Sequence, residues 1–586
     1  MLKGLPIGVE DFKKIRETDC YYIDKTKLIE DLLIDKTEVK LFCRPRRFGK
    51  TLSMSTLRYF FDIKNGEENR KLFDGLYISN SPLMSEQGKY PVIFISMKGV
   101  TGHTWKSSFS DIKLKIKELF KDYSYLVDSF DKYDKLDFEK YILDIESLEE
   151  ADLKKSLHIL TKLLCKYYNQ KVILLIDEYD SPILSAVEKG YYTEMKDFLR
   201  AFYGDALKTN EYLQMGVLTG IIRVTQAGIF SDLNNIENYT ILKKSYSQYF
   251  GLLEAEVEEA LRYYGIEYKL DEVRAWYDGY NFAGTEVYNP LSILKYIKEK
   301  ELESYWINTS GNALIMEIIA NSDDRVIKDL EKLFEEKELE TTVDLELDMG
   351  KSLLESDIWS LMLSSGYLTI KEKLGDDNYI IKIPNKEIRS FFKKAFIKMV
   401  FKGTRYVEDV KRALLTKDLE SFEIAFQNMV LESISFHNTT LNMRKEEGKE
   451  VDELAYSEVP YQMFMLGFLT SMQDKFFVTP EQESGLGRAD ILLEPKNKNG
   501  VGYILEIKAA RKNNRISNLA KRAHKQIDSK IYETELRKRG VVDIVKIGIA
   551  CRGKGGEYVP GPCTHRPSSH ESRGYLKCVT ARSALG

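Results

Sequence analysis

Residues 41–52 read LFCRPRRFGKTL, and this stretch decides how the N-terminal part of the chain folds. The segment 38–43 is typical of a short strand, and residues 52–61 have the pattern of a helix. Between them, Gly49-Lys50-Thr51 is the second half of a phosphate-binding loop, in which backbone N–H groups at a helix N-terminus face phosphate oxygens. We expect the Lys50 ammonium to reach the β and γ phosphates and the Thr51 hydroxyl to bind Mg²⁺. Arg44 stands where the full motif has a glycine.

A second strand-like segment ends in paired carboxylates. Residues 172–178 read VILLIDE, so Asp177 and Glu178 follow a short apolar run that is typical of a buried strand. At the end of such a strand, Asp177 can hold Mg²⁺ and Glu178 can polarise an attacking water. The alternative is a strand that only ends in surface acids. Because the phosphate loop and the Asp-Glu pair each follow an expected strand, we favour a nucleotide site.

Four expected strands alternate with helical segments in the first 240 residues. The strands are expected at 38–43, 91–97, 171–176 and 212–219. This alternation predicts a parallel α/β sheet with helices on both faces. Thr219 lies just past the fourth strand, where a sensor of the γ-phosphate would lie, and Arg223 could stabilise charge in cis or across a subunit contact. A strand-end cap and an ordinary surface arginine are the alternatives for these two residues.

The middle of the chain has a different pattern after residue 240. It is helical and rich in aromatic residues until a helical run at 356–365 leads through Gly366 into YLTIKEK and then YIIKI, with a Gly/Asp/Asn turn between them. Two alternating segments around such a turn predict a β-hairpin. A hairpin directly after helices is consistent with a winged helix. The charged stretch 444–453 is the expected linker to the next domain.

Residues 485–508 read GLGRADILLEPKNKNGVGYILEIK and place a second group of charges on expected strands. Asp490 opens one strand, and Glu506 and Lys508 point to the same face of the next because they are two residues apart. Charges on strands with apolar flanks are costly unless they are paired or bind a metal. Asp490 and Glu506 could converge on Mg²⁺, which would activate a water that Lys508 orients. The alternative is an ordinary amphipathic hairpin.

These segments resemble the bacterial AAA-ATPase-like proteins that carry a C-terminal PD-(D/E)XK nuclease-like domain. The matching motifs run along most of the chain: GVEDF at 8–12, YIDKT at 22–26, RPRRFGKT at 44–51, IDEYD at 176–180, LTG at 218–220, WYDGY at 276–280 and YNPL at 288–291. The resemblance implies ATP and Mg²⁺ as cofactors. It also implies a nucleotide-binding loop made of Arg44, Arg46, Arg47, Phe48, Gly49, Lys50, Thr51 and Leu52.

In the nuclease-like part, the resemblance adds residues to the catalytic set of Asp490, Glu506 and Lys508. Gln526 with Tyr532 resembles the Gln…Tyr element of this nuclease superfamily, and Glu458 matches its first acidic position. The family helix commonly reads Tyr-His, whereas Gln462 stands here in place of the histidine. This departure puts a role for position 462 in doubt.

Composition limits where nucleic acid could bind. The 586 residues carry a net charge of −4, with 43% hydrophobic and 30% charged residues, as in a globular protein that is not broadly basic. A DNA contact must therefore be a local patch. The cations of the segment 511–530 could form it, and a solvated amphipathic face is an equal alternative. These cations are Arg511, Lys512, Arg515, Lys521, Arg522, Lys525 and Lys530.

The last 36 residues differ from the rest of the chain. Residues 551–586 contain six Lys/Arg against two Asp/Glu and three of the six cysteines, and they show no hydrophobic period. We expect residues 553–586 to be a disordered and non-native tail. A zinc site is the weaker alternative because no CxxC pair accompanies its candidate ligands. Those candidates are Cys563, His565, His570 and Cys578.

The sequence thus predicts an α/β chain with a P-loop ATPase-like domain at 1–240, a helical lid and winged-helix-like region at 241–445, and a restriction-endonuclease-like α/β domain at 446–552. We expect an ATPase that is fused to a Mg²⁺-dependent nuclease and cleaves DNA. The alternative is a nucleotide-switched scaffold that binds nucleic acid or protein. Few cysteines, no apolar leader and no membrane-length apolar run predict a cytoplasmic protein with no membrane contact. A homo-oligomer is left open.

Overall fold

The computed structural model divides into two compact units, Met1–Ile315 with Lys332–Arg389 and Met316–Glu331 with Ser390–Gly586, and each unit is described by itself. The structure describes residues 2–224, 229–230, 233–267, 269–306, 322, 324–334, 337–347, 355–392, 405–426, 428, 472–473, 475–484, 487–497, 500–509, 516–551 and 574–577. No helix among these residues is long and apolar enough to cross a membrane.

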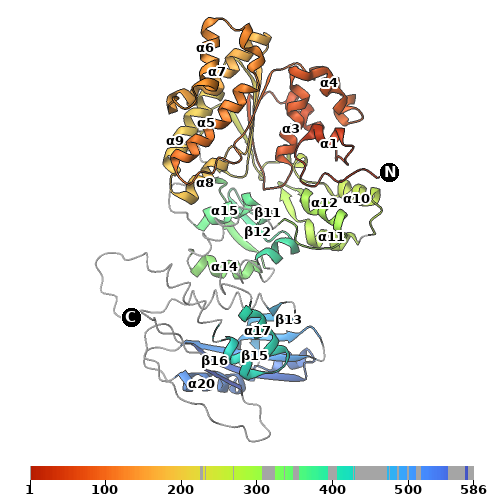
Figure 1. Cartoon of the computed structure of the whole chain (residues 1–586). Helices are drawn as coiled ribbons and strands as arrows, with labels where there is room; N and C mark the ends of the chain where they lie inside the picture. The colour runs from red at the N-terminus through yellow and green to blue at the C-terminus, as the bar shows by residue number, and fades with distance from the viewer. Residues whose placement is uncertain are drawn as a thin grey trace, which may run out of the picture. The chain divides into compact units, whose positions relative to one another are not determined.

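The first unit is built on a five-stranded parallel sheet in the order β2-β3-β4-β1-β6 (Figure 1). The strands are β1 Val39–Cys43, β2 Val92–Ser96, β3 Val172–Asp177, β4 Leu213–Gly220 and β6 Ile236–Tyr239. The first four confirm the predicted strands, and β6 was not predicted. The strand β4 lies between β1 and β3. The end of β1 at Cys43 and the end of β3 at Asp177 are therefore both next to β4.

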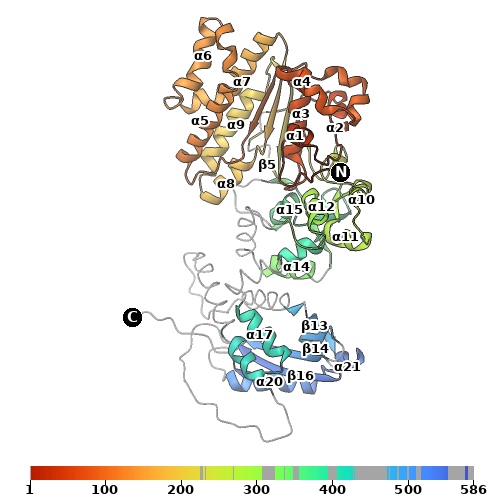
Figure 2. The ribbon, with the colours of Figure 1, turned by 45° about the vertical axis from the view of Figure 1, so that its right-hand side comes forward.

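Helices cover both faces of this sheet, as predicted (Figures 1 and 2). The helices α1, α3 and α4 lie on one face, and α5, α7 and α9 lie on the other. Their bounds are α1 Phe12–Glu17, α2 Lys27–Ile34, α3 Lys50–Phe61, α4 Gly66–Arg70, α5 Trp105–Lys121, α6 Lys132–Leu143, α7 Glu150–Tyr168, α8 Ser181–Lys189 and α9 Tyr192–Leu207. Every residue of β3 is buried, as expected for a strand covered on both faces.

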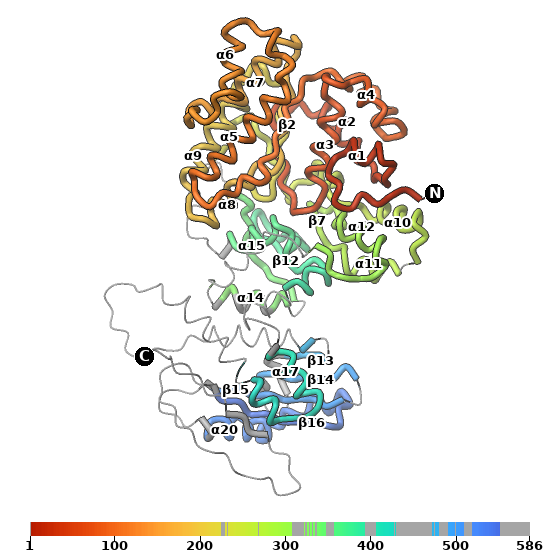
Figure 3. The backbone as a smooth tube through the Cα atoms, viewed as in Figure 1, coloured from red at the N-terminus to blue at the C-terminus, as the bar shows by residue number. Residues whose placement is uncertain are grey.

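Three further helices and a short hairpin form a second core within the same unit. They are α10 Glu254–Tyr263, α11 Leu270–Tyr277, α12 Pro290–Glu299, β7 Tyr280–Phe282 and β8 Thr285–Val287. Their buried cluster includes Val257, Tyr277 and Ile293, and Leu5 and Tyr21 of the N-terminal segment pack against it. Figure 3 shows this segment running beside α10 and α12. The chain start therefore links the two cores of the unit.

The predicted hairpin after residue 366 is confirmed. Helix α15 Glu355–Ser365 leads into β11 Thr369–Lys373 and β12 Asn378–Lys382, which pair antiparallel, and β9 Leu339–Thr342 pairs antiparallel with β12. The winged-helix assignment itself stays a prediction. The remaining short strands are β5 Arg223–Val224 and β10 Glu346–Leu347. The helix α14 Asp324–Phe334 lies mainly in the second unit, whose first segment ends at Glu331.

The second unit contains a mixed sheet in the order β13-β14-β15-β16-β17. Its first three strands pair antiparallel and its last three pair parallel. The strands are β13 Phe476–Ser484, β14 Gly487–Pro495, β15 Val501–Ala509, β16 Asp543–Cys551 and β17 Gly574–Lys577. The helices are α17 Arg405–Leu415, α20 Ile516–Ser529 and α21 Thr534–Lys538. This is the predicted α/β pattern of the C-terminal part.

Two boundaries differ from those expected. The helix α17 belongs to the second unit, and not to a continuous region 241–445, because the Tyr503 hydroxyl donates to the Leu414 carbonyl and Lys417 pairs with Asp543. In the predicted tail, β17 pairs with β16, so disorder does not hold for its four residues. The rest of the tail with its zinc candidates, the linker 444–453, Glu458 and Gln462 lie outside the described residues, as do Arg511, Lys512 and Arg515.

Candidate functional site

The predicted phosphate loop connects β1 directly to α3. Gly49 has φ 85° at the N-cap of α3, a left-handed conformation that glycine adopts without strain. Lys50 is buried, and its ammonium donates to the carbonyls of Arg44 (2.9 Å) and Pro45 (2.8 Å). Burial lowers the pKa of Lys50, and the carboxylates of the segment 177–180 oppose this shift. The ammonium therefore lies inside the loop, at the N-terminus of a helix, where an anion is favoured.

A buried carboxylate joins the loop to the centre of the sheet. The Thr51 hydroxyl donates to one oxygen of Asp177 (2.9 Å), and the Thr219 hydroxyl donates to the other (2.5 Å). Asp177 is fully buried at the end of β3. The structure thus brings together three predicted site residues from α3, β3 and β4. Hydroxyl and carboxylate oxygens are the ligands that Mg²⁺ prefers, so this group fits the predicted ion.

Glu178 follows Asp177 in a left-handed conformation, with φ 52°. Burial, and next the charge of Asp177, raise the pKa of Glu178 above its usual value. A carboxylate with a raised pKa at the edge of the sheet is suited to accept a proton near neutral pH. Asp180 was not among the predicted site residues. It is buried and accepts from the backbone N–H groups of Ile221 (2.7 Å) and Ile222 (2.9 Å). Asp180 thereby fixes the segment after β4 beside Glu178.

Arg44 points away from the loop interior. Its guanidinium is fully buried, donates to the carbonyls of Cys43 (2.9 Å) and Tyr239 (2.5 Å), and lies over the rings of Phe250 and Phe282. Burial lowers the pKa of Arg44 to about 10. The predicted contact of Arg44 with nucleotide can therefore involve only its backbone.

The other predicted loop residues serve different contacts. Phe48 is fully buried, and its ring packs against the hairpin residues Tyr280 (4.9 Å between centroids) and Phe282 (5.4 Å). Arg46 is partly exposed and Arg47 is exposed. Arg223 pairs with Glu346 on β10, so its predicted charge-stabilising role would require this pair to open. That role stays a prediction.

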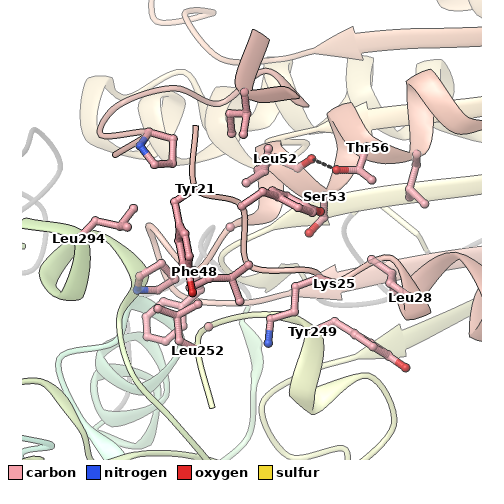
Figure 4. Close-up of a pocket in the computed structure, with 18 of the residues that line it drawn as sticks. Tyr21, Lys25, Leu28, Phe48, Leu52, Ser53, Thr56, Tyr249, Leu252 and Leu294 are labelled. Carbon is pink, nitrogen blue, oxygen red and sulfur yellow. Dashed lines mark hydrogen bonds between the residues drawn. The ribbon is translucent and has the colours of Figure 1, made fainter. Parts of the chain in front are cut away.

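An apolar cavity of about 100 Å³, which was not predicted, lies against the first turns of α3 (Figure 4). Gly49, Leu52 and Ser53 line it from the loop side. The opposite lining comes from segments distant in sequence, namely Pro6, Tyr21, Lys25, Tyr249, Leu252, Pro290 and Leu294. The YIDKT motif thus supplies part of a cavity wall next to the phosphate loop.

Lys25 is the charged residue of that wall. Its ammonium donates to the Gln248 carbonyl (2.9 Å) and to a Glu256 carboxylate oxygen (2.7 Å). Burial lowers the pKa of Lys25 despite the nearby carboxylate. These two bonds connect the N-terminal segment to α10 and to the segment before it. They keep the part of the cavity wall around Lys25 in place.

A second group of predicted residues meets on β15 in the second unit. One Glu506 oxygen accepts from the Lys508 ammonium (2.6 Å) and from the Gln526 amide (2.6 Å), and that amide also donates to the Tyr532 hydroxyl (3.1 Å). Asp490 accepts from the backbone N–H of Ile507 (2.6 Å). The structure therefore brings together Asp490, Glu506, Lys508 and Gln526.

The second carboxylate oxygen of Glu506 fits a bound cation. Glu506 is 1% exposed, and this oxygen is buried with no hydrogen-bond partner among the described residues. Burial raises the pKa of Glu506, and the charge of Asp490 adds to the shift. An unpaired buried carboxylate oxygen is costly, and a cation would remove that cost. In the part of the chain that the structure describes, no group of three or more His, Cys, Asp or Glu residues is arranged to hold a metal ion.

Comparison with known proteins agrees with this geometry. Residues 6–230 match the family model described as predicted AAA-ATPase, and residues 456–559 match that of the PD-(D/E)XK nuclease superfamily. Both parts of the predicted resemblance are confirmed. The chain is also 28% identical over 400 residues to an uncharacterized protein in the vnfD 5' region of Azotobacter chroococcum mcd 1. The match covers 67% of this chain and 70% of that protein.

We expect Lys50→Ala to weaken binding of MgATP by about 10- to 100-fold. The variant removes an ammonium, and hydrogen bonds to charged groups contribute about 1.5–3 kcal/mol. Isothermal titration calorimetry on the folded variant checks this. Lys71→Ala, which removes an exposed lysine, is the control and should bind as wild type. Equal affinities of Lys50→Ala and wild type would contradict the phosphate-loop assignment.

We expect Glu506→Gln to lower Mn²⁺ affinity at least about tenfold in calorimetry without nucleotide, because a neutral amide oxygen is a weaker ligand for a divalent cation than a charged carboxylate. Because the pKa of Glu506 is raised, lowering the pH should protonate it earlier than an ordinary glutamate. The Mn²⁺ affinity of the wild type should therefore begin to fall at a pH above the usual glutamate pKa. The matched control is Glu494→Gln on β14, whose carboxylate pairs with Arg539. Unchanged Mn²⁺ binding by Glu506→Gln would show that the metal does not bind there.

Proposed function

We propose that the first unit binds and hydrolyses ATP with Mg²⁺ and that the second unit cleaves DNA with a divalent metal. The observation that carries the first half is the meeting of Lys50 and Thr51 on α3 with Asp177 on β3. The observation that carries the second half is the buried, unpaired oxygen of Glu506 beside Lys508. The AAA-ATPase-like and nuclease-like matches support the same division.

In the proposed ATPase, each residue has a distinct task. The helix N-terminus at Gly49 and the Lys50 ammonium bind the phosphates, and Thr51 and Asp177 would hold Mg²⁺, which neutralises phosphate charge when bound. Thr219 keeps the Asp177 carboxylate oriented through its hydrogen bond. Glu178 accepts the proton of the attacking water, a task that its raised pKa suits.

We place the base and ribose of ATP at the cavity beside the loop. This cavity of about 100 Å³ must widen to admit them. The cavity borders Gly49 and Ser53, so a nucleotide whose phosphates lie at the N-terminus of α3 extends naturally into it. Its walls are mainly apolar with a few polar side chains, the usual character of a pocket for an aromatic ligand. The side chains of Tyr21 and Tyr249 belong to this wall.

In the proposed nuclease, Asp490 and Glu506 would hold the metal, which supplies an activated water when bound. Lys508 is held at Glu506, where it can orient that water or offset phosphate charge. Gln526 fixes the shared Glu506 oxygen from α20 through its amide. This leaves the other Glu506 oxygen to face the metal.

The exposed face of α20 supports DNA as the substrate. Lys521, Arg522, Lys525 and Lys530 are exposed, and within the described residues none of them forms an ion pair. The neighbouring acids are already paired, because Asp528 and Glu533 bind Lys546 and Glu535 binds Arg539. The cations therefore remain uncompensated on a chain of net charge −4, as a phosphate-binding patch requires.

One observation favours a nucleotide-switched scaffold as a second candidate. The described residues supply two carboxylates to the metal site, and Lys508 already neutralises one oxygen of Glu506. A nuclease fold with a weakened metal site could bind DNA without cutting it. Cleavage assays distinguish this candidate from the nuclease.

We expect Glu178→Gln to abolish ATP hydrolysis while ATP still binds. We expect Asp490→Asn to abolish metal-dependent DNA cleavage while ATP hydrolysis continues. Phosphate release and plasmid nicking with Mg²⁺ or Mn²⁺ measure the two activities. Because the pKa of Glu178 is raised, the wild-type ATPase rate should fall as pH decreases through a range above that of an ordinary glutamate. Wild type that nicks no plasmid would support the scaffold, and wild type that releases no phosphate would overturn the ATPase.

We expect Ser53→Leu to weaken MgATP binding about tenfold or more and to leave inorganic tripolyphosphate binding nearly unchanged. The larger side chain fills the cavity without touching the phosphate loop, so it competes only with the base and ribose. Calorimetry with both ligands checks this. Ser110→Leu places the same change on an exposed site of α5 and is the control. Equal losses for both ligands would place the base elsewhere.

A further inference from the structure

The carbonyl groups of the phosphate loop accept hydrogen bonds from outside the loop backbone. Lys50 caps the carbonyls of Arg44 and Pro45, and the indole N–H of Trp306 donates to the carbonyl of Arg46 (3.3 Å). A loop that turns its N–H groups toward an anion must satisfy its carbonyls on the other side. Trp306 does this at the third carbonyl, where Lys50 does not reach.

Trp306 lies far along the chain from the loop. It is 260 residues from Arg46 and beyond the segment 6–230 that matches the ATPase family model. Its side chain is 3% exposed, and its ring packs edge-on against Tyr367 just before β11 (5.1 Å between centroids). The indole is therefore held rigidly while its N–H faces the loop.

A buried carboxylate fixes the backbone that carries Trp306. One oxygen of Glu387 accepts from the N–H groups of Tyr305 (2.6 Å) and Trp306 (2.7 Å), and the other accepts from the Ser292 hydroxyl (2.8 Å). Glu387 is fully buried, and the loop residue Arg47 provides an opposite charge nearby. Glu387 thus holds Trp306 in place from α12 and from the segment after β12.

Two further loop side chains, Pro45 and Phe48, contact residues that follow residue 240 in the sequence. A Cβ atom added at Gly366 would lie 2.9 Å from the Cβ of Pro45, so only glycine allows this close approach. Phe48 packs against Tyr280, and its carbonyl accepts from the N–H of Gly251 (3.1 Å). The packing of the loop therefore depends on residues after 240.

We propose that Trp306, held by Glu387, is a positioning residue that sets the shape of the phosphate loop for binding. The proposal rests on the nucleotide-binding function proposed above. It means that the functional ATPase extends through residue 389 of the first unit and is not complete at residue 230. In this role, Trp306 contacts the phosphate loop and not the ligand.

The test compares two ligands on the full chain. We expect Trp306→Phe to weaken MgATP and inorganic tripolyphosphate by the same factor, about two- to tenfold, because one hydrogen bond to the loop is lost. The phenylalanine ring keeps the contact with Tyr367. Trp276→Phe is the matched control, since Trp276 packs on the α10–α12 core away from the loop and should leave both affinities unchanged.

A second pair of variants tests the carboxylate. Glu387→Gln can still accept from both backbone N–H groups and can donate to the Ser292 hydroxyl, so both affinities should stay near wild type. Glu387→Ala removes the acceptor and should weaken both ligands as Trp306→Phe does. Urea unfolding of each variant separates this effect from a general loss of stability, which would change the midpoint without a matched loss of affinity in the folded protein.

Matched losses in Trp306→Phe and Glu387→Ala, with Glu387→Gln and Trp276→Phe near wild type, support the proposal. Trp306→Phe with wild-type affinities, in a protein that binds MgATP, overturns the positioning role and leaves the nucleotide function standing. A wild-type chain that binds neither ligand overturns both.

Discussion

The hydrogen bonds around Asp177 constrain the whole first unit. This fully buried carboxylate accepts from Thr51 on α3 and from Thr219 on β4, so a helix and two strands must keep one relative position. A buried charge costs free energy unless it is hydrogen-bonded, and two hydroxyls reduce that cost without neutralising the charge. Among the described residues, the buried Lys50 ammonium donates to the loop carbonyls of Arg44 and Pro45 and not to Asp177. The site is thus held in shape while its charges stay available for a phosphate–magnesium ligand.

The buried carboxylate of the second unit, Glu506, is hydrogen-bonded differently from Asp177. One oxygen of Glu506 has two donors and the other has none among the described residues, whereas both oxygens of Asp177 have a donor. The unpaired oxygen makes Glu506 the more costly group to bury, and its raised pKa reflects that cost. A cation would remove the cost at Glu506 directly. At Asp177 a cation would instead have to redirect two hydroxyl hydrogens.

Local sequence patterns predicted much of this structure. The strands that end at Cys43 and Asp177 are short and apolar, and the turn between β11 and β12 has the residues of a hairpin, so their positions were predictable. β6 was missed because IENY has no continuous apolar run and gains its pairing only from β1. The outward direction of Arg44 was equally hidden, because it depends on rings at 250 and 282 that the sequence does not place beside residue 44.

The features that escaped prediction share a physical cause. The cavity, the Trp306 contact and the place of α17 all depend on pairs of residues that are far apart in the chain, and such pairs leave no periodicity to detect. The sequence after residue 240 indicated only a helical region rich in aromatic residues, yet one of these residues donates to a loop carbonyl. A buried indole retains one polar N–H that must find an acceptor. The partner of that N–H, more than the burial of the ring, therefore distinguishes Trp306 from an ordinary core tryptophan.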